Sequence, residues 1–114
     1  MTSGIKTVIY PVKDLDQAKA LFSTLIGVQP DADAPYYVGY TVEGQHVGLL
    51  PNGHAQGMMG PVGYWHVDNI KGTLEALLAA GAETRQEIQN VGGGRQIASV
   101  ADPDGNVIGL IQDA

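Results

Sequence analysis

A repeated turn-and-strand motif is the feature that most constrains the fold of this chain. In residues 102–112 the turn formers Asp-Pro-Asp-Gly-Asn precede the apolar run Val-Ile-Gly-Leu-Ile, which is typical of a tight turn leading into a strand. Residues 43–50 have the same plan, with two glycines and a leucine at matching places. The matched pairs are Gly44 with Gly105, Gly48 with Gly109 and Leu49 with Leu110. This internal repeat predicts two structural units of one design.

The first half of the chain is expected to form a strand, a helix and then further strands. Residues 5–12 are rich in β-branched and aromatic side chains, which favours a strand. Asp14 is a suitable helix N-cap, apolar residues follow at helical spacing, and Gly27 is suited to end the helix. Residues 36–42 and 45–50 then predict a hairpin around a two-residue turn.

The second half repeats this order. Residues 62–67 are expected to form a strand, Asn69 to cap a helix, and Gly81 to stop that helix. Residues 83–89 and 95–101 predict the middle strands, and the repeated motif supplies the last one. The order strand, helix, three strands therefore occurs twice, which is a βαβββ plan in each half.

Composition limits the classes of function. The chain has 114 residues, no cysteine, and six Lys or Arg against twelve Asp or Glu. No basic stripe is available to neutralise phosphates, so nucleic acid is not an expected partner. The first residues do not resemble a signal peptide, and no apolar run approaches the roughly 20 residues of a membrane span. We therefore expect a cytoplasmic protein, with no membrane partner, that binds a small molecule.

The doubled plan and three local motifs resemble the vicinal oxygen chelate superfamily of glyoxalases, extradiol dioxygenases and bleomycin-resistance proteins. The motifs are the two helix entries, Val-Lys-Asp-Leu at 12–15 and Val-Asp-Asn-Ile at 67–70, and the turn at 102–106. The resemblance implies an α+β fold of two tandem βαβββ modules that form a curved mixed sheet with the helices on its convex face. We expect one domain, with modules at about 1–52 and 61–114 and a Gly/Met-rich linker at 53–60.

The resemblance also implies where a metal would be bound. Enzymes of the superfamily hold a divalent metal with donors from the first and last strand of each module. The matching positions here are Thr7, Gly48, Val62 and Gly109. A first-row metal needs three or four His, Cys, Asp or Glu donors at about 2.0–2.3 Å, and none of the four residues is one. We therefore expect no metal and no other cofactor.

Alternation of side chains along the strands assigns residues to the inner face of the predicted sheet. Small residues leave volume there, aromatic rings offer stacking, and hydroxyl and imidazole groups can orient a ligand. The candidate ligand-binding residues are Thr7, Tyr37, Thr41, His46, Leu50, Tyr64 and His66. The same alternation places Ala98 and Val100 on the inner face and Trp65 and Leu110 toward the helices. Alternatively, the tyrosines fill the groove or contact another subunit.

These observations favour a metal-independent protein that binds a small, aromatic or hydrophobic molecule and sequesters a natural product or antibiotic. The alternative is an isomerase or lyase acting on a small oxygenated metabolite, with His46 or His66 as acid or base. Both histidines are also compatible with simple hydrogen bonding at strand ends. A third role is interaction with another protein. The resemblance to short bleomycin-resistance proteins implies a homodimer, which would also cover sheet edges.

Overall fold

The computed structural model describes residues 2–114 and has an α+β fold. Its elements in chain order are β1 (Thr2–Pro11), α1 (Leu15–Ile26), β2 (Ala32–Ala34), β3 (Tyr37–Val42), β4 (Gln45–Leu50), the 3-10 helix η1 (His54–Gln56), β5 (Val62–Val67), α2 (Ile70–Ala79), β6 (Glu83–Asn90), β7 (Gln96–Ala101) and β8 (Val107–Gln112). The strands form an eight-stranded mixed sheet in the order β2-β3-β4-β1-β5-β8-β7-β6. The predicted fold class is confirmed.

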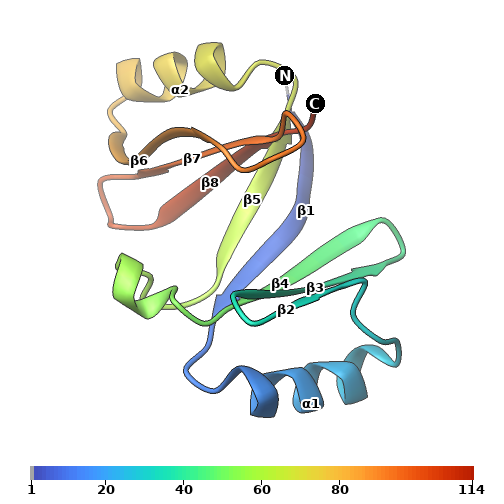
Figure 1. The fold of residues 1–114 in the computed structure, drawn as a ribbon. Coiled ribbons are helices and arrows are strands. Elements are labelled where there is room, and N and C mark those ends of the chain that lie inside the picture. The colour runs from blue at the N-terminus through green and yellow to red at the C-terminus, as the bar shows by residue number, and fades with distance from the viewer. Residues whose placement is uncertain (1) are drawn as a thin grey trace. The chain divides into compact units, whose positions relative to one another are not determined.

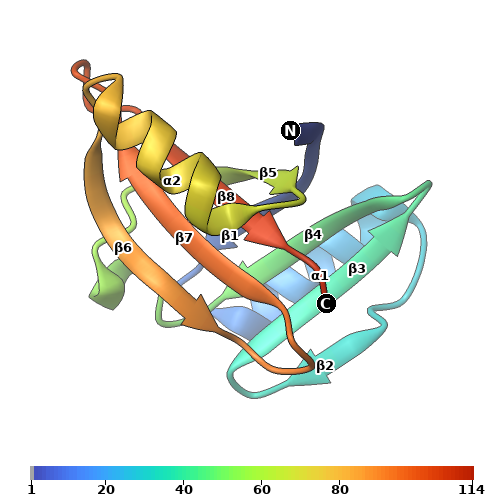
Figure 2. The ribbon, with the colours of Figure 1, turned by 90° about the horizontal axis from the view of Figure 1, so that it is seen from above.

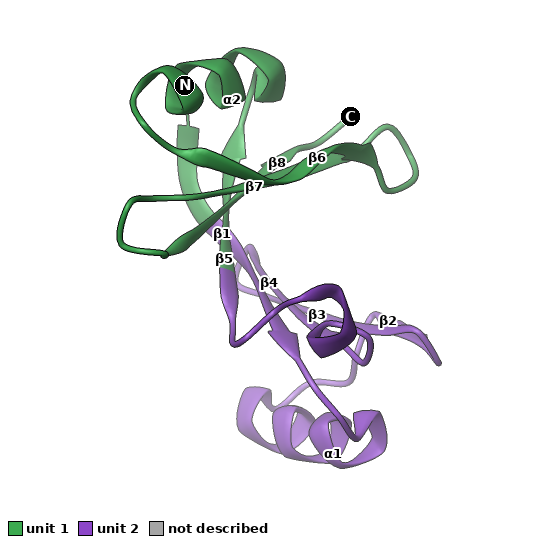
Figure 3. Ribbon diagram, turned by 90° about the vertical axis from the view of Figure 1, so that its left-hand side faces the viewer, with its two compact units in different colours: residues 1–5, 63–114 green, residues 6–62 purple. Residues whose placement is uncertain are grey.

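The chain forms two compact units, which are coloured separately in Figure 3. The first unit consists of residues 6–62, and the second of residues 63–114 with residues 2–5 at the start of β1. In the first unit β1 runs parallel to β4, and β3 lies antiparallel between β2 and β4. In the second unit β5 runs parallel to β8, and β7 lies antiparallel between β6 and β8. Each unit therefore has the predicted βαβββ connectivity.

The helix of the first unit begins and ends where the sequence predicts. The Asp14 carboxylate accepts a hydrogen bond of 3.0 Å from the Gln17 backbone N–H, and Gly27 adopts a left-handed conformation with φ 83°. These contacts satisfy backbone groups that a helix end leaves unpaired. The helix packs on β3 and β4 (Figure 1), where Val38, Tyr40 and Leu49 are buried with an exposure of 1% or less.

The helix of the second unit is tied to its sheet at its first residue. The Asn69 side chain accepts from the Gly72 backbone N–H at 3.1 Å, as a helix cap should, and the Ile70 N–H donates to Oε1 of Gln112 at 2.6 Å. The helix lies across β7 and β8 (Figure 2). Its core consists of Val67, Ile70, Leu74, Ala98, Val100 and Leu110. This core is entirely aliphatic.

The predicted orientation of β7 is wrong. Ala98 and Val100 were expected on the inner face, but both are fully buried and belong to the core under α2. The register explains the difference, because Ala98 lies opposite Leu110 and Ser99 lies opposite Gly109. The facing of β7 therefore depends on how the loop at residues 102–106 closes the hairpin, and counting along β7 alone does not determine it.

Trp65 departs from expectation in a different way. Its cross-strand partner is Leu110, so the two residues share one side of the sheet. Trp65 is nevertheless 38% exposed and does not belong to the core under α2. The side of the sheet predicted for Trp65 is therefore right, but the side chain is exposed there.

The expected linker at residues 53–60 lies within the first unit and is partly ordered by local hydrogen bonds. Residues His54–Gln56 form a 3-10 helix, and Gly57 ends it with φ 93°. Gly53 is buried, and a Cβ atom at this position would lie 2.7 Å from Cβ of Pro11. The predicted linker therefore includes one packed turn. None of the helices described in residues 2–114 is long and apolar enough to cross a membrane.

Candidate functional site

The face of the first unit that lies opposite α1 carries a row of three polar side chains. Thr41 of β3 is the cross-strand partner of His46 of β4, and His46 is in turn the partner of Thr7 of β1. Partners in adjacent strands point to the same side of a sheet. Three of the seven predicted ligand-binding residues therefore lie side by side in the first unit.

A tight turn fixes this arrangement. Glu43 and Gly44 connect β3 to β4 with φ values of 50° and 76°, so both residues are left-handed, as a type I′ hairpin turn requires. Glu43 is the only non-glycine residue with positive φ among residues 2–114. A two-residue turn sets the register of the hairpin, and here it places Thr41 opposite His46.

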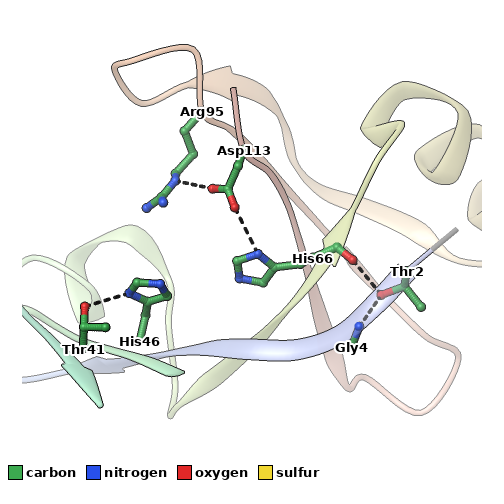
Figure 4. Close-up of polar contacts among 7 residues, drawn as sticks. All are labelled: Thr2, Gly4, Thr41, His46, His66, Arg95 and Asp113. Carbon is green, nitrogen blue, oxygen red and sulfur yellow. Dashed lines mark hydrogen bonds and ion pairs between the residues drawn. The ribbon is translucent and has the colours of Figure 1, made fainter. Parts of the chain in front are cut away.

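A hydrogen-bonded chain joins His46 to a carboxylate. The Thr41 hydroxyl donates to Oδ2 of Asp31 at 2.7 Å. The same hydroxyl oxygen lies 3.1 Å from Nδ1 of His46, a contact drawn in Figure 4. Asp31 is held in turn by its backbone N–H, which donates to the carbonyl oxygen of Gly39 at 2.9 Å. Sequence reasoning did not identify Asp31, because no pattern links a loop residue before β2 to the far end of β3.

The second unit contains a carboxylate beside its own histidine. Nδ1 of His66 lies 3.4 Å from Oδ2 of Asp113, and Nε of Arg95 donates to Oδ1 of Asp113 at 2.8 Å (Figure 4). The Thr2 hydroxyl donates to the backbone carbonyl of His66 at 2.8 Å. Sequence reasoning missed Arg95 and Asp113 because they lie on different strand ends that only the β7–β8 pairing brings together. In each unit, therefore, Nδ1 of a histidine faces a carboxylate, directly or through a hydroxyl.

The glycine of the last strand in the first unit lies under side chains. A Cβ atom placed on Gly48 would lie 2.6 Å from Cδ1 of Ile9 and 2.8 Å from Cε1 of Tyr37. Tyr37 also approaches Gly39, where a Cβ atom would lie 2.9 Å from its Cε2. The Tyr37 ring therefore packs closely against a backbone surface that only glycine provides.

The corresponding glycine in the second unit has the same kind of cover. A Cβ atom on Gly109 would lie 2.6 Å from Cδ2 and 2.8 Å from Cγ of Tyr64. Tyr64 is the direct cross-strand partner of Gly109 and is only 9% exposed. The surface directly above each of these two glycines is thus covered by a tyrosine ring.

The side chains at the four positions implied for a metal do not fit one. Gly48 and Gly109 carry no donor and lie under aromatic rings, and Val62 is aliphatic. Thr7 offers only a hydroxyl, which is not among the usual ligands of a first-row metal. Within residues 2–114, no group of three or more His, Cys, Asp or Glu side chains is placed to hold a metal ion.

The remaining predicted ligand residues lie as follows. Leu50 ends β4 opposite Pro11 and is half-buried, while Tyr64 and His66 lie on β5 in the second unit. A hollow of about 380 Å³ in the first unit lies elsewhere, between the end of β1 and the start of α1. Tyr10 and Phe22 line it, with ring centroids 4.9 Å apart, and none of the seven predicted residues does.

Comparison with known structures shows the same fold in several proteins. A glyoxalase/bleomycin resistance protein/dioxygenase superfamily member from Vibrio splendidus 12B01 is 18% identical with a TM-score of 0.71, over 100% of both chains. The Mn(II)-bound glyoxalase from Novosphingobium aromaticivorans is 21% identical with a TM-score of 0.73, over 98% of this chain and 39% of the other. Streptomyces coelicolor methylmalonyl-CoA epimerase in complex with 2-nitronate-propionyl-CoA is 14% identical with a TM-score of 0.74, over 100% of this chain and 99% of the other.

Comparison at the sequence level identifies the family. No curated protein sequence matches the chain. The family model described as Glyoxalase/Bleomycin resistance protein/Dioxygenase superfamily matches residues 4–110, which is nearly the whole chain. The predicted resemblance is confirmed: the chain belongs to the glyoxalase/bleomycin resistance protein/dioxygenase superfamily.

Proposed function

We propose that this protein binds a flat, aromatic or hydrophobic small molecule with its own side chains and without a metal. One observation carries the proposal: at the last-strand position of each unit, where the resemblance places a metal donor, a glycine lies under a tyrosine ring. Aromatic rings supply stacking area, and the adjacent hydroxyl and imidazole groups supply orientation. A natural product or antibiotic is the expected kind of ligand.

The proposal predicts that two tyrosines contribute strongly to affinity. A panel of aromatic compounds is screened by thermal shift, and the Kd of each hit is measured by calorimetry. Tyr37→Leu and Tyr64→Leu are expected to weaken binding by about tenfold each, since loss of a well-placed aromatic contact costs roughly 1 to 2 kcal/mol. Tyr36→Leu is the matched control, because Tyr36 is 71% exposed and adjacent to Tyr37.

The metal-independent part of the proposal is tested separately. Binding is measured after chelator treatment and again after addition of Mn²⁺, Ni²⁺, Zn²⁺ or Fe²⁺, and an unchanged Kd is expected. Stoichiometric metal uptake, with ligand binding that disappears on chelation, would overturn this part. Equal affinity of the Tyr37→Leu, Tyr64→Leu and wild-type proteins would overturn the aromatic part.

A second candidate function is acid–base catalysis, as an isomerase or lyase on a small oxygenated metabolite. The hydrogen-bonded chain Asp31–Thr41–His46 favours it, because a carboxylate that orients an imidazole is a common arrangement for proton transfer. The test is to incubate a bound ligand in D₂O and to measure deuterium incorporation by mass spectrometry. Incorporation that His46→Gln abolishes would establish catalysis, and recovery of the unlabelled ligand would leave the binding function in place.

We also propose a homodimer. The strand order ends in β2 and β6, whose outer edges have no strand partner within residues 2–114. Unpaired edges favour association with another strand, and pairing in a dimer would satisfy them. Light scattering after size exclusion is expected to give about twice the chain mass of 11.9 kDa. A monomer mass at micromolar concentration would contradict this.

A further inference from the structure

We propose that Asp31 and Thr41 hold the neutral His46 ring as its Nδ1–H tautomer, so that Nε2 accepts a hydrogen bond from the ligand. Asp31 and Thr41 are positioning residues, and the ligand class that suits such an acceptor is an aromatic molecule with a free hydroxyl group, a phenol. The ligand part rests on the proposed function of this face, whereas the tautomer does not depend on any ligand.

The protons available on Asp31, Thr41 and His46 determine which group donates in each of the two hydrogen bonds. An ionised carboxylate only accepts hydrogen bonds, and a threonine hydroxyl has a single proton to donate. At 2.7 Å from Oδ2 of Asp31, that proton is committed to the carboxylate. The Thr41 oxygen can then act only as an acceptor toward Nδ1 of His46 at 3.1 Å. The proton of the neutral imidazole must therefore be on Nδ1.

Backbone contacts hold the three residues in register. Thr41 and His46 are direct partners across a hairpin whose type I′ turn allows one pairing. Asp31 is fixed by its backbone bond to Gly39, which lies two residues before Thr41 on the same strand. Thr41 is β-branched, so its hydroxyl direction is restricted at χ1. The hydrogen-bonded residues Asp31, Thr41 and His46 are thus positioned by a short stretch of sheet, and their arrangement does not depend on long, flexible side chains.

The tautomer determines which ligands this histidine accepts. With Nδ1 protonated, Nε2 carries the lone pair and accepts from an O–H or N–H group. A ligand that presents only an acceptor, such as a methyl ether, would face that lone pair and lose the bond. Nε2 of His46 therefore selects for a hydrogen-bond donor on the ligand.

The tautomer is measured in the free protein by ¹⁵N and ¹³C NMR of labelled histidine rings, under conditions in which the ring signals themselves show the neutral form. The chain has three histidines, and His46→Gln assigns the signal. We expect Nδ1–H in the wild type. Thr41→Val and Asp31→Ala are each expected to raise the ratio of the Nε2–H to the Nδ1–H tautomer by about fivefold, which corresponds to the loss of about one hydrogen bond.

Two variants serve as controls for this measurement. Thr41→Ser keeps the hydroxyl and should keep the Nδ1–H signature. Asp33→Ala removes a nearby carboxylate that pairs with Lys19 instead, and it should leave the His46 ring unchanged. A wild-type His46 found mainly as Nε2–H would overturn the positioning role and would leave the proposed binding function untouched.

The ligand class is tested with a matched pair of probes, 2-naphthol and 2-methoxynaphthalene, by calorimetry. The wild type is expected to bind the naphthol about fivefold more tightly, and this ratio should fall to about one in His46→Leu and decrease in Thr41→Val. Equal binding of both probes by the wild type would overturn the phenol preference while the aromatic site stands. Failure of both probes to bind, with the Nδ1–H signature present, would count against the aromatic site and the phenol preference but not against the positioning role.

Discussion

The glycine in the last strand is covered by different strands in the two units. In the second unit the ring comes from the neighbouring strand, where Tyr64 lies directly opposite Gly109. In the first unit the neighbouring strand supplies Ile9 opposite Gly48, and the ring of Tyr37 arrives from β3 on the other side. Both units thus have a glycine surface without a Cβ atom in the last strand. The strand that provides the covering side chain differs between the units.

The two helix-facing cores differ in a similar way. In the first unit the hydroxyl of the buried Tyr40 lies 2.8 Å from Oγ of Ser23 and donates to the carbonyl oxygen of Lys19 at 3.1 Å. In the second unit the core under α2 is aliphatic. In the first unit, therefore, a buried tyrosine of the core is hydrogen-bonded to the helix, whereas in the second unit the core is apolar and the helix is hydrogen-bonded to the sheet at its first residue, Ile70.

The largest effect is expected where the two units are most alike. Leu49 and Leu110 occupy matching places in the repeat and are 0% and 2% exposed. Leu49→Ala and Leu110→Ala should each lower the free energy of unfolding by about 3 kcal/mol, through lost burial and a cavity. Chemical denaturation measures this, and Leu25→Ala, at a side chain 78% exposed, should cost less than about 0.5 kcal/mol. Strongly unequal losses of unfolding free energy in Leu49→Ala and Leu110→Ala would show that the two cores are not equivalent.

Substitution of the two covered glycines should lower the free energy of unfolding by different amounts in the two units. In Gly109→Ala the new methyl group meets Cγ of Tyr64, the root of the ring, so the whole side chain must move. In Gly48→Ala it meets the outer atoms of Ile9 and Tyr37, which can yield. We expect losses of about 2 to 3 kcal/mol at Gly109 and about 1 kcal/mol at Gly48, within the usual range for overpacking.

A double-mutant cycle checks the cause of the Gly109 effect. Tyr64→Leu should reduce the cost of Gly109→Ala, with a coupling of about 1 kcal/mol or more between the two positions. Additive losses would show that the ring does not cause the strain. The alanine backbone would then be the source of the cost.

Removal of a single hydroxyl tests the difference between the two cores. Tyr40→Phe should cost about 1 kcal/mol of unfolding free energy, because Ser23 and the Lys19 carbonyl lose their partner inside a buried region. Thermal unfolding of the variant, compared with Tyr36→Phe at an exposed tyrosine, gives the measurement. Ser23→Ala combined with Tyr40→Phe should cost little more than Tyr40→Phe alone, and full additivity would argue against the bond.

The smallest effect concerns the turns that introduce the repeated strands. Hydrogen bonds from the Asn106 side chain and backbone, and from the backbone of Asp104 and Gly105, lower the pKa of Asp102 below its ordinary value of 3.8. A lowered pKa means that this contribution to stability is present above the unfolded value and is lost as the pH falls through the folded value. The Glu43–Gly44 turn of the first unit relies on its left-handed backbone instead.

The pH dependence is measured from the Asn106 amide chemical shifts between about pH 5 and pH 2, spanning the range in which carboxylates titrate. We expect the turn at 102–106 to loosen at the acid end in the wild type. Asp102→Asn should remove this dependence, and the hairpin around Gly44 serves as an internal reference. Identical titration curves for Asp102→Asn and the wild type would contradict the role of the carboxylate.

Local signals in the sequence predicted most of the elements. Asp14, Gly27 and Asn69 act through hydrogen bonds and backbone conformations within a few residues, so their roles follow from residue type. The facing of β3 and β4 also followed from alternation, because a two-residue turn joins them. The same two-residue turn fixes which residues of β3 and β4 lie opposite each other, so the Thr41–His46 pair could be predicted from it.

Longer-range features lay outside what local signals can predict. The facing of β7 was wrong because its register with β8 depends on the closure of residues 102–106. Asp31, Arg95 and Asp113 gained their partners only through tertiary folding. The positions of the tyrosine rings depend on side-chain rotamers, which no residue pattern specifies.

The sequence by itself determined the doubled βαβββ plan, the helix ends and the absence of metal donors at Gly48 and Gly109, because these depend on residue type and spacing along the chain. Only the tertiary structure decided that Tyr37 and Tyr64 lie against those glycines and that a carboxylate is joined to Nδ1 of each strand histidine, directly at His66 and through the Thr41 hydroxyl at His46. The physical reason is that close packing and hydrogen bonding join atoms whose distance depends on strand register and rotamer, and a linear pattern specifies neither.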